Sequence, residues 1–308
     1  MSKVLYIIGN GFDLHHKLRT SYFDYNHYLK EFHSDVLSEI GRSKFFNSSY
    51  CSEAEENDKK EKGNFWSCLE QSLLFDYEEY FEDVIFVYEP NFADKHPNFG
   101  RMIFQVDDDK IPFSKFTDDY LIEWIKSIDV GKCQKDQILN LSKKDFYLSF
   151  NYTNTLQVVY NIPDANILHL HGSLKEHLAS ETPLQFGNPE DSAEQIQQRL
   201  ENKYADHPCG SWVTDAIPAV VDLCRALTKN LKQNYESLKN FIQNKNFDEV
   251  IVMGHSFLGA DKPYYDDILI PSLEKCKWTF YVYDDNDKKN VLKFKQMHPT
   301  ICVSEKNW

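Results

Sequence analysis

The stretch that decides the fold is a run of apolar residues that stops at a glycine turn, Val4-Leu5-Tyr6-Ile7-Ile8-Gly9-Asn10-Gly11-Phe12-Asp13. Five consecutive apolar residues of this kind are typical of a strand that is buried on both faces of a parallel sheet. Five later stretches are also expected to be strands, namely Phe146–Phe150, Ile167–His171, Glu249–Met253, Trp278–Tyr283 and Thr300–Ser304. Segments whose apolar residues recur with helical spacing lie between these predicted strands. The alternation predicts an α/β fold with a doubly wound, Rossmann-like parallel sheet.

The 308 residues are expected to form a single α/β domain, 1–308. Residues 21–145 are too many for one crossover and predict a helical insertion or cap. It would begin at a capping box, Ser21 with Asp24, on a helix that runs to about Ile40. Further expectations inside it are an exposed loop over Asn47–Gly63 and one long amphipathic helix over Trp66–Tyr88. Residues 190–244 predict a second helical segment within the same domain.

Composition limits the classes of partner. The net charge of −14, without a local basic patch, argues against direct binding of nucleic acid. No run of residues is long and apolar enough to cross a bilayer, so no membrane partner is expected. Seven cysteines without a C-x-x-C pair predict reduced thiols in a cytoplasmic protein and no metal. The remaining candidate partners are a small nucleotide ligand and a second copy of the chain.

Polar segments follow four of the predicted strands, and ligands of open parallel sheets bind beyond the carboxyl ends of the strands. In the first segment, Gly9 and Gly11 would let the backbone approach a phosphate closely. The third glycine of the dinucleotide fingerprint would fall at Leu14, where it is missing. The alternative is a glycine turn that only links strand to helix.

The second segment contains Asn151, Tyr152 and Thr153. An asparagine side chain both donates and accepts hydrogen bonds, as ribose hydroxyls or a positioned water would require. The alternative is an Asx turn or a helix cap, which is common for Asn and Thr after strands.

The third segment is His169-Leu170-His171-Gly172. Strand alternation would place both histidines on one face, but no third metal ligand is evident. His171, at the end of the strand beside Gly172, is placed to act as a general base near neutral pH. His169 is interpreted as a core residue.

The fourth segment, Gly254-His255-Ser256 with Asp261 beyond it, allows two interpretations. One is a turn that binds phosphate or ribose. The other is the nucleophile elbow of an α/β-hydrolase, in which Asp284 and His298 would complete a triad with Ser256.

Together these segments resemble the AbiH family of bacterial phage abortive-infection proteins. The resemblance rests on Gly9-Asn10-Gly11-Phe12-Asp13-Leu14, Thr20-Ser21-Tyr22, Phe150-Asn151-Tyr152-Thr153, His171-Gly172, Gly187-Asn188-Pro189 and Gly254-His255-Ser256. Lys17 and Arg19 stand where that family is expected to have glycine and proline.

AbiH-like chains are in turn similar to the sirtuin-type NAD-binding fold, which implies NAD as substrate or ligand and its hydrolysis as the activity. Sirtuins place an aspartate two residues after the asparagine, where this chain has Thr153, and carry a zinc module that is absent here. The resemblance implies a phage-derived trigger as a further partner, and it implies that Asn151 and His171 are catalytic. It also implies a cofactor-binding set of Gly9, Asn10, Gly11, Phe12, Asp13, Tyr152, Thr153, Gly172, Gly254, His255, Ser256 and Asp261.

Three functions therefore remain open at the level of sequence. The first is a phage-defence effector that binds and hydrolyses NAD or a related nucleotide. The second is a serine hydrolase that uses Ser256. The third is a nucleotide-binding regulator of a defence system without catalysis.

Overall fold

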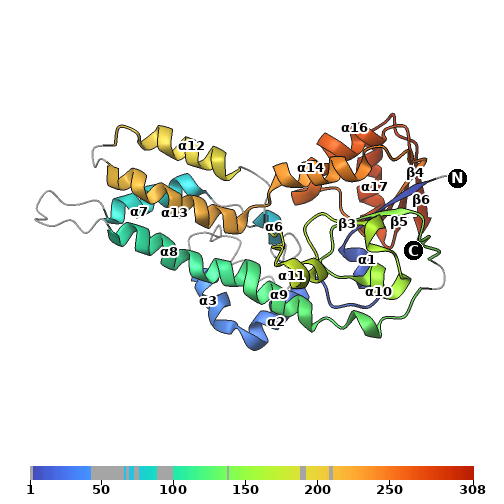
Figure 1. Cartoon of the computed structure of the whole chain (residues 1–308), viewed down its shortest axis with the longest axis horizontal. Helices are drawn as coiled ribbons and strands as arrows, with labels where there is room; N and C mark the ends of the chain where they lie inside the picture. The colour runs from blue at the N-terminus through green and yellow to red at the C-terminus, as the bar shows by residue number, and fades with distance from the viewer. Residues whose placement is uncertain are drawn as a thin grey trace, which may run out of the picture. The chain divides into compact units, whose positions relative to one another are not determined.

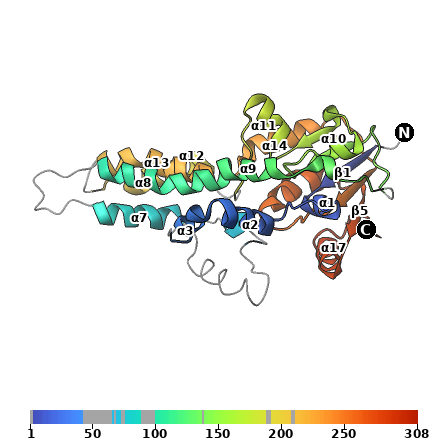
Figure 2. The same ribbon diagram turned by 90° about the horizontal axis from the view of Figure 1, so that it is seen from below.

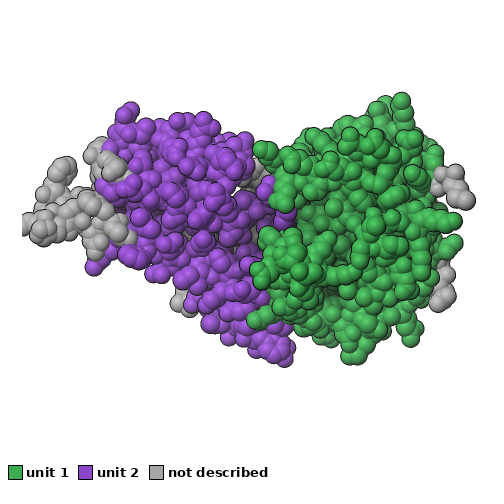
Figure 3. All heavy atoms as spheres, in the orientation of Figure 1, with its two compact units in different colours: residues 1–24, 122–184, 231–308 green, residues 25–121, 185–230 purple. Residues whose placement is uncertain are grey.

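The structure is a computed structural model that describes residues 3–42, 66, 69–72, 76–88, 100–136, 139–187, 192–207 and 211–308 (Figure 1 and, turned by 90°, Figure 2). The chain divides into two compact units, which Figure 3 colours separately. Unit 1 comprises 1–24, 122–184 and 231–308, and unit 2 comprises 25–121 and 185–230. The loop expected over Asn47–Gly63 lies outside the described residues.

Unit 1 is built on a six-stranded sheet in the order β3-β2-β1-β4-β5-β6. Each pair of neighbouring strands is parallel, which confirms the α/β fold with a doubly wound parallel sheet. The strands are β1 (Val4–Ile8), β2 (Phe146–Ser149), β3 (Ile167–His169), β4 (Glu249–Met253), β5 (Lys277–Val282) and β6 (Val303–Asn307).

Apolar side chains cover both faces of the central strand. Leu5 and Ile7 point into one core cluster, and Tyr6 and Ile8 point into a second cluster on the opposite face. Burial on both sides explains why the strand sequence is continuously apolar instead of alternating. The sheet therefore separates two hydrophobic cores within unit 1.

Helices fill both of these cores. The helices assigned to unit 1 are α1 (Asn10–His15), α10 (Thr155–Tyr160), α11 (Leu174–Ser180), α14 (Leu231–Ile242), α15 (Lys262–Tyr264), α16 (Ile270–Leu273) and α17 (Asp285–Met297). Phe12 of α1 and Leu156 of α10 pack on the face of Tyr6. Leu238 of α14 and Phe294 of α17 pack on the face of Leu5.

Unit 2 is helical in its described residues. Its elements are α3 (Ser34–Arg42), α6 (Leu69–Ser72), α7 (Tyr77–Tyr88), α8 (Gly100–Ser114), α12 (Ala193–Tyr204), α13 (Ser211–Leu227) and a π-helical turn (Lys115–Asp119), while α2 (Tyr22–Phe32) and α9 (Tyr120–Ser127) span the boundary in sequence. α8 and α13 run side by side in both views (Figure 1 and Figure 2). Lys229 is buried here and pairs with Glu70 at 2.6 Å. No described helix is long and apolar enough to span a membrane.

The expected capping box is confirmed, because Ser21 Oγ accepts from the Asp24 amide and the Ser21 amide donates to the Asp24 carboxylate. The helix that it starts is shorter than expected, since α2 ends at Phe32 and α3 begins at Ser34. The expectation of one helix over Trp66–Tyr88 is wrong.

Asp76 is the reason for that error. It is not helical, and its carboxylate accepts from the Glu79 amide, so it caps a new helix, α7. The spacing of apolar residues indicates which face of a helix is buried, but it does not indicate where one helix ends and the next begins.

Lys17 stands where the family is expected to have glycine. Its φ of +63° is in the left-handed region, so the backbone there keeps the conformation that a glycine would adopt freely.

The loops after β1 and β4 touch through their backbones. The Gly11 amide donates to the Gly254 carbonyl at 2.8 Å, and the Gly9 amide donates to the Met253 carbonyl at 3.1 Å. A Cβ on Gly254 would lie 2.3 Å from the Phe12 amide nitrogen, a distance that real Cβ atoms do not show. Gly254 also has a φ of +60°. The two loops can meet in this way only if glycine occupies these positions.

Gly254→Ala is therefore expected to reduce the free energy of unfolding by about 2–5 kcal/mol, from left-handed strain together with overpacking. Urea unfolding followed by circular dichroism measures the loss. Gly131→Ala is the matched control, because a Cβ there meets only the Asp129 carboxylate at 3.3 Å, and it should change stability by less than about 0.5 kcal/mol. Equal stability of the two variants would contradict this account of the loop contact.

Candidate functional site

The four polar segments identified in the sequence meet at one edge of the sheet in unit 1. Strands β1 to β4 are parallel, so their carboxyl ends share that edge. The side-chain amide of Asn151 donates through Nδ2 to the Gly9 carbonyl at 3.0 Å, which ties the segment after β2 to the segment after β1. Gly9 packs closely against His255, and His171 Nε2 lies 3.4 Å from Asp261 Oδ1. Contacts thus link all four segments.

The glycines do not leave an open phosphate cradle. The strand order reverses between β1 and β4, which is where doubly wound folds usually open a ligand crevice. Here Gly9 and Gly11 pack directly against Gly254 at that point. The amides of Gly11 and Phe12 already donate to carbonyls of the chain. The close approach that these glycines permit is one loop on another.

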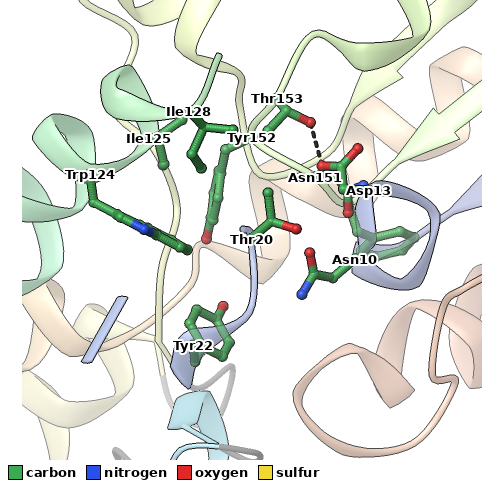
Figure 4. Close-up of a pocket in the computed structure, with 11 residues that line it drawn as sticks. Asn10, Asp13, Thr20, Tyr22, Trp124, Ile125, Ile128, Asn151, Tyr152 and Thr153 are labelled. Atoms are coloured by element: carbon green, nitrogen blue, oxygen red, sulfur yellow. Dashed lines mark hydrogen bonds between the residues drawn. The ribbon is translucent and has the colours of Figure 1, made fainter. Parts of the chain in front are cut away.

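A pocket instead opens beside the β1 and β2 loops (Figure 4). Its cavity volume is about 80 Å³, several times the roughly 10–15 Å³ that one water needs. One side is apolar and aromatic, and the other is polar. The lining residues are Asn10, Asp13, Thr20, Tyr22, Trp124, Ile125, Ile128, Phe150, Asn151, Tyr152 and Thr153, all of unit 1.

Asp13 is a buried carboxyl at the polar end of this pocket, with 1% of its surface exposed. Its Oδ2 accepts from the Thr153 hydroxyl at 2.5 Å, drawn as a dashed line in Figure 4. Its Oδ1 has no hydrogen-bond partner among the described residues, and neither does the hydroxyl of Thr20. Burial raises the pKa of Asp13 from 3.8 to about 6, although the hydrogen bond from Thr153 and the nearby polar side chains of Thr155 and Asn151 lower it.

A buried acceptor without a partner costs free energy unless a ligand or a water satisfies it. Two such atoms, Asp13 Oδ1 and Thr20 Oγ1, line the same cavity. The arrangement suits a ligand group that donates hydrogen bonds.

The second cluster is a pair of histidines that share one carboxylate. His171 Nε2 lies 3.4 Å from Asp261 Oδ1, and His255 Nε2 lies 3.2 Å from Asp261 Oδ2. His255 Nδ1 is 2.8 Å from the Tyr265 hydroxyl. Burial and then Asp261 raise the pKa of Tyr265 well above 10, so its hydroxyl keeps its proton. Because a carboxylate only accepts hydrogen bonds, the contact between His255 and Asp261 places a hydrogen on Nε2.

Phe150 connects the two clusters. It lines the pocket, and its ring centroid lies 3.9 Å from that of His255 and 5.3 Å from that of His171. His171 itself is 2% exposed. The histidine pair thus lies in a mostly apolar enclosure next to the pocket, where its electrostatic interactions are weakly screened.

The expectation that His169 and His171 share a face is wrong. β3 ends at His169, and the Gly172 amide donates to the His169 carbonyl in a turn. His169 contacts Gln157 and the Asn151 carbonyl, whereas His171 packs on Phe150 and Asp261. Period-two alternation stops where the strand stops. Burial lowers the pKa of His169, which fits the core role expected for it.

The alternative triad of Ser256, Asp284 and His298 is excluded by geometry. Asp284 caps the amino end of α17 and His298 caps its carboxyl end. A helix of 13 residues is roughly 20 Å long at 1.5 Å per residue, so the two side chains cannot act on one group. The exposed Ser256 accepts a hydrogen bond from the Leu258 amide, as in an ordinary turn.

Other predicted site residues are found in different surroundings. Phe12 is fully buried in the core against His16 and Tyr160, so its ring does not face the pocket. Gly172 has a φ of +80° and packs under Pro183. Asn10, Tyr152 and Thr153 all line the pocket.

Six of the pocket residues are not among the site residues expected from the sequence. They are Thr20, Tyr22, Trp124, Ile125, Ile128 and Phe150. Thr20 and Tyr22 belong to the Thr-Ser-Tyr motif and Phe150 to the Phe-Asn-Tyr-Thr motif, so these three could have been found from the motifs. Trp124, Ile125 and Ile128 look like ordinary helix periodicity in the sequence, and only the packing of α9 reveals them.

The fold and the site define an α/β protein whose pocket lies beyond the carboxyl ends of a doubly wound parallel sheet. The family described as bacteriophage abortive infection AbiH matches residues 5–282. The chain therefore belongs to the AbiH family. Comparisons with curated proteins and with solved structures find no significant match.

The buried carboxyl predicts a stability effect that depends on pH. Because the pKa of Asp13 is raised to about 6 by folding, its stabilising contribution is complete below about pH 4 and is lost as pH rises through about 6. The cost above that range is about 3 kcal/mol. Asp13→Asn should therefore unfold at higher urea concentration than the wild type at pH 8, and the difference should disappear towards pH 4.

Asp206→Asn, a change at an exposed carboxylate, is the control and should leave both ends of the pH range unchanged. If Asp13→Asn were destabilised equally at both pH values, Asp13 would be a structural hydrogen-bond acceptor and not a strained site residue.

Proposed function

We propose that this AbiH protein is an abortive-infection effector that binds NAD or a related nucleotide and hydrolyses its N-glycosidic bond. The proposal is supported chiefly by the unsatisfied Asp13 oxygen in an aromatic-lined pocket at the carboxyl edge of the sheet. Buried titratable groups whose pKa is shifted by their surroundings, and which line a cleft, are characteristic of functional sites. Loss of NAD would halt the infected cell before phage are released.

The reaction needs little from the protein beyond positioning. Water attacks C1′ of the ribose, the glycosidic bond breaks with its electron pair going to the base, and one proton leaves the water. Asn151, held by the Gly9 carbonyl, is assigned to the ribose hydroxyls or the water. His171, with Asp261 behind it, is assigned as the base that takes the proton.

The test follows NAD in infected cells, because defence effectors are commonly inactive until triggered. Cells that express the protein should lose NAD after phage challenge and accumulate free nicotinamide, measured by mass spectrometry. His171→Gln should slow the loss by about 10²–10⁴-fold, the usual cost of losing a general base. His298→Gln is the matched control, since His298 lies at the far end of α17.

Glutamine replaces alanine in this design because His171 packs against Phe150 and Tyr264, and truncation to alanine would leave a cavity. A constant NAD pool during growth arrest, with both variants still protective, would contradict the hydrolytic function.

The enclosure of His171 supports one second candidate, a nucleotide-binding regulator without catalysis. In that case His171→Gln would retain defence, and substitutions in the pocket would abolish it without any change in cellular NAD.

A further inference from the structure

The ligand chemistry of the pocket follows from its walls. Trp124, Tyr22 and Tyr152 contribute aromatic side chains, and Ile125 and Ile128 extend the apolar side (Figure 4). A set of flat aromatic and aliphatic groups favours a planar aromatic ligand over a sugar or a phosphate.

The charge of the pocket has one sign. Asp13 is the only carboxylic acid among the described residues of the lining, and no lysine or arginine joins it there. An anion would be placed against a buried carboxylate without a compensating cation, which is costly. A cation would gain from the carboxylate and from the faces of the aromatic rings.

Two buried polar atoms of the pocket that lack a hydrogen-bond partner among the described residues indicate which polar group the ligand should carry. Asp13 Oδ1 is a buried acceptor without a partner among the described residues, and Thr20 Oγ1 is a second unused group in the same cavity. A ligand that supplies an N–H donor at the edge of its ring would satisfy Asp13 directly.

We propose that this pocket is the subsite for a planar aromatic cation that carries an amide N–H, as the pyridinium carboxamide of a nicotinamide nucleotide does. Asp13 accepts from the amide and balances the ring charge, while Trp124, Tyr22 and Tyr152 enclose the ring. The inference rests on the proposed function and adds the part of the substrate that the protein recognises.

The subsite also has a consequence for turnover. When the glycosidic bond breaks, its electron pair returns to the ring nitrogen and the ring becomes neutral. The product then keeps the amide hydrogen bond to Asp13 but loses the charge attraction. The pocket would thus bind the cationic ring more tightly than the neutral one. This favours product release, but it does not lower the barrier to bond cleavage, because the ring has already lost part of its charge in the transition state.

The test uses three small probes on the purified full-length protein by isothermal titration calorimetry at pH 8. 1-Methylnicotinamide is a cationic ring with an amide, nicotinamide is a neutral ring with the same amide, and 1-methylnicotinate is a cationic ring with a carboxylate. The wild type should bind 1-methylnicotinamide at least 10-fold more tightly than either of the other two.

Asp13→Asn should reduce the preference for 1-methylnicotinamide over nicotinamide to less than about threefold, while Asp206→Asn keeps the wild-type preference. Circular dichroism verifies that each variant is folded. Thr20→Val provides a second variant, nearly isosteric, that should weaken all three probes. The comparison of probes on the wild type stands even if a variant does not fold.

Absence of 1-methylnicotinamide binding at millimolar concentration, or equal binding of all three probes, would overturn the subsite. These outcomes differ from failure of the proposed function. Binding with the expected preference, in cells whose NAD does not fall, would retain the subsite and reject hydrolysis. NAD loss in cells, without any preference among the probes, would support hydrolysis and reject the subsite.

Discussion

The interaction on which the rest of this structure depends is the backbone contact between the loops after β1 and β4. Gly11 donates to the Gly254 carbonyl, and the missing side chains at Gly9, Gly11 and Gly254 leave room for it. The contact joins the two halves of the doubly wound sheet at the place where its strand order reverses. Because it closes that place, the pocket opens to the side, beside the loop after β2.

The position of Asp13 follows from the same contact. The first turn of α1 is held against the β4 loop, which turns the Asp13 carboxyl towards Thr153 and into the pocket. A buried carboxyl with an unused oxygen weakens the fold, and proteins tolerate such conflicts mainly where a ligand resolves them.

The histidine cluster shows how a motif can be placed correctly and still behave differently from expectation. His171 does lie at the edge of the sheet with the other segments, but a turn after β3 rotates it away from His169 and towards Asp261. Asp261 serves His171 and His255 together, so a substitution at any of the three alters the others. Phe150 lines the pocket and also packs against both histidines, so the cluster and the pocket lie next to each other.

The sequence by itself determined the sheet and the segments that end its strands. Uninterrupted apolar runs such as Val4–Ile8 and Val250–Met253 depend only on burial on both faces, which is a local property of a parallel strand. The sequence also indicated that these segments share one edge of the sheet, but tertiary structure alone decided which individual side chains contact one another. Thr153 and Asp13 are 140 residues apart in sequence, and Trp124 reaches the pocket from a helix with ordinary periodicity. Apolar periodicity states which face of an element is buried and never against what, so partners so distant in the chain become evident only when the elements pack.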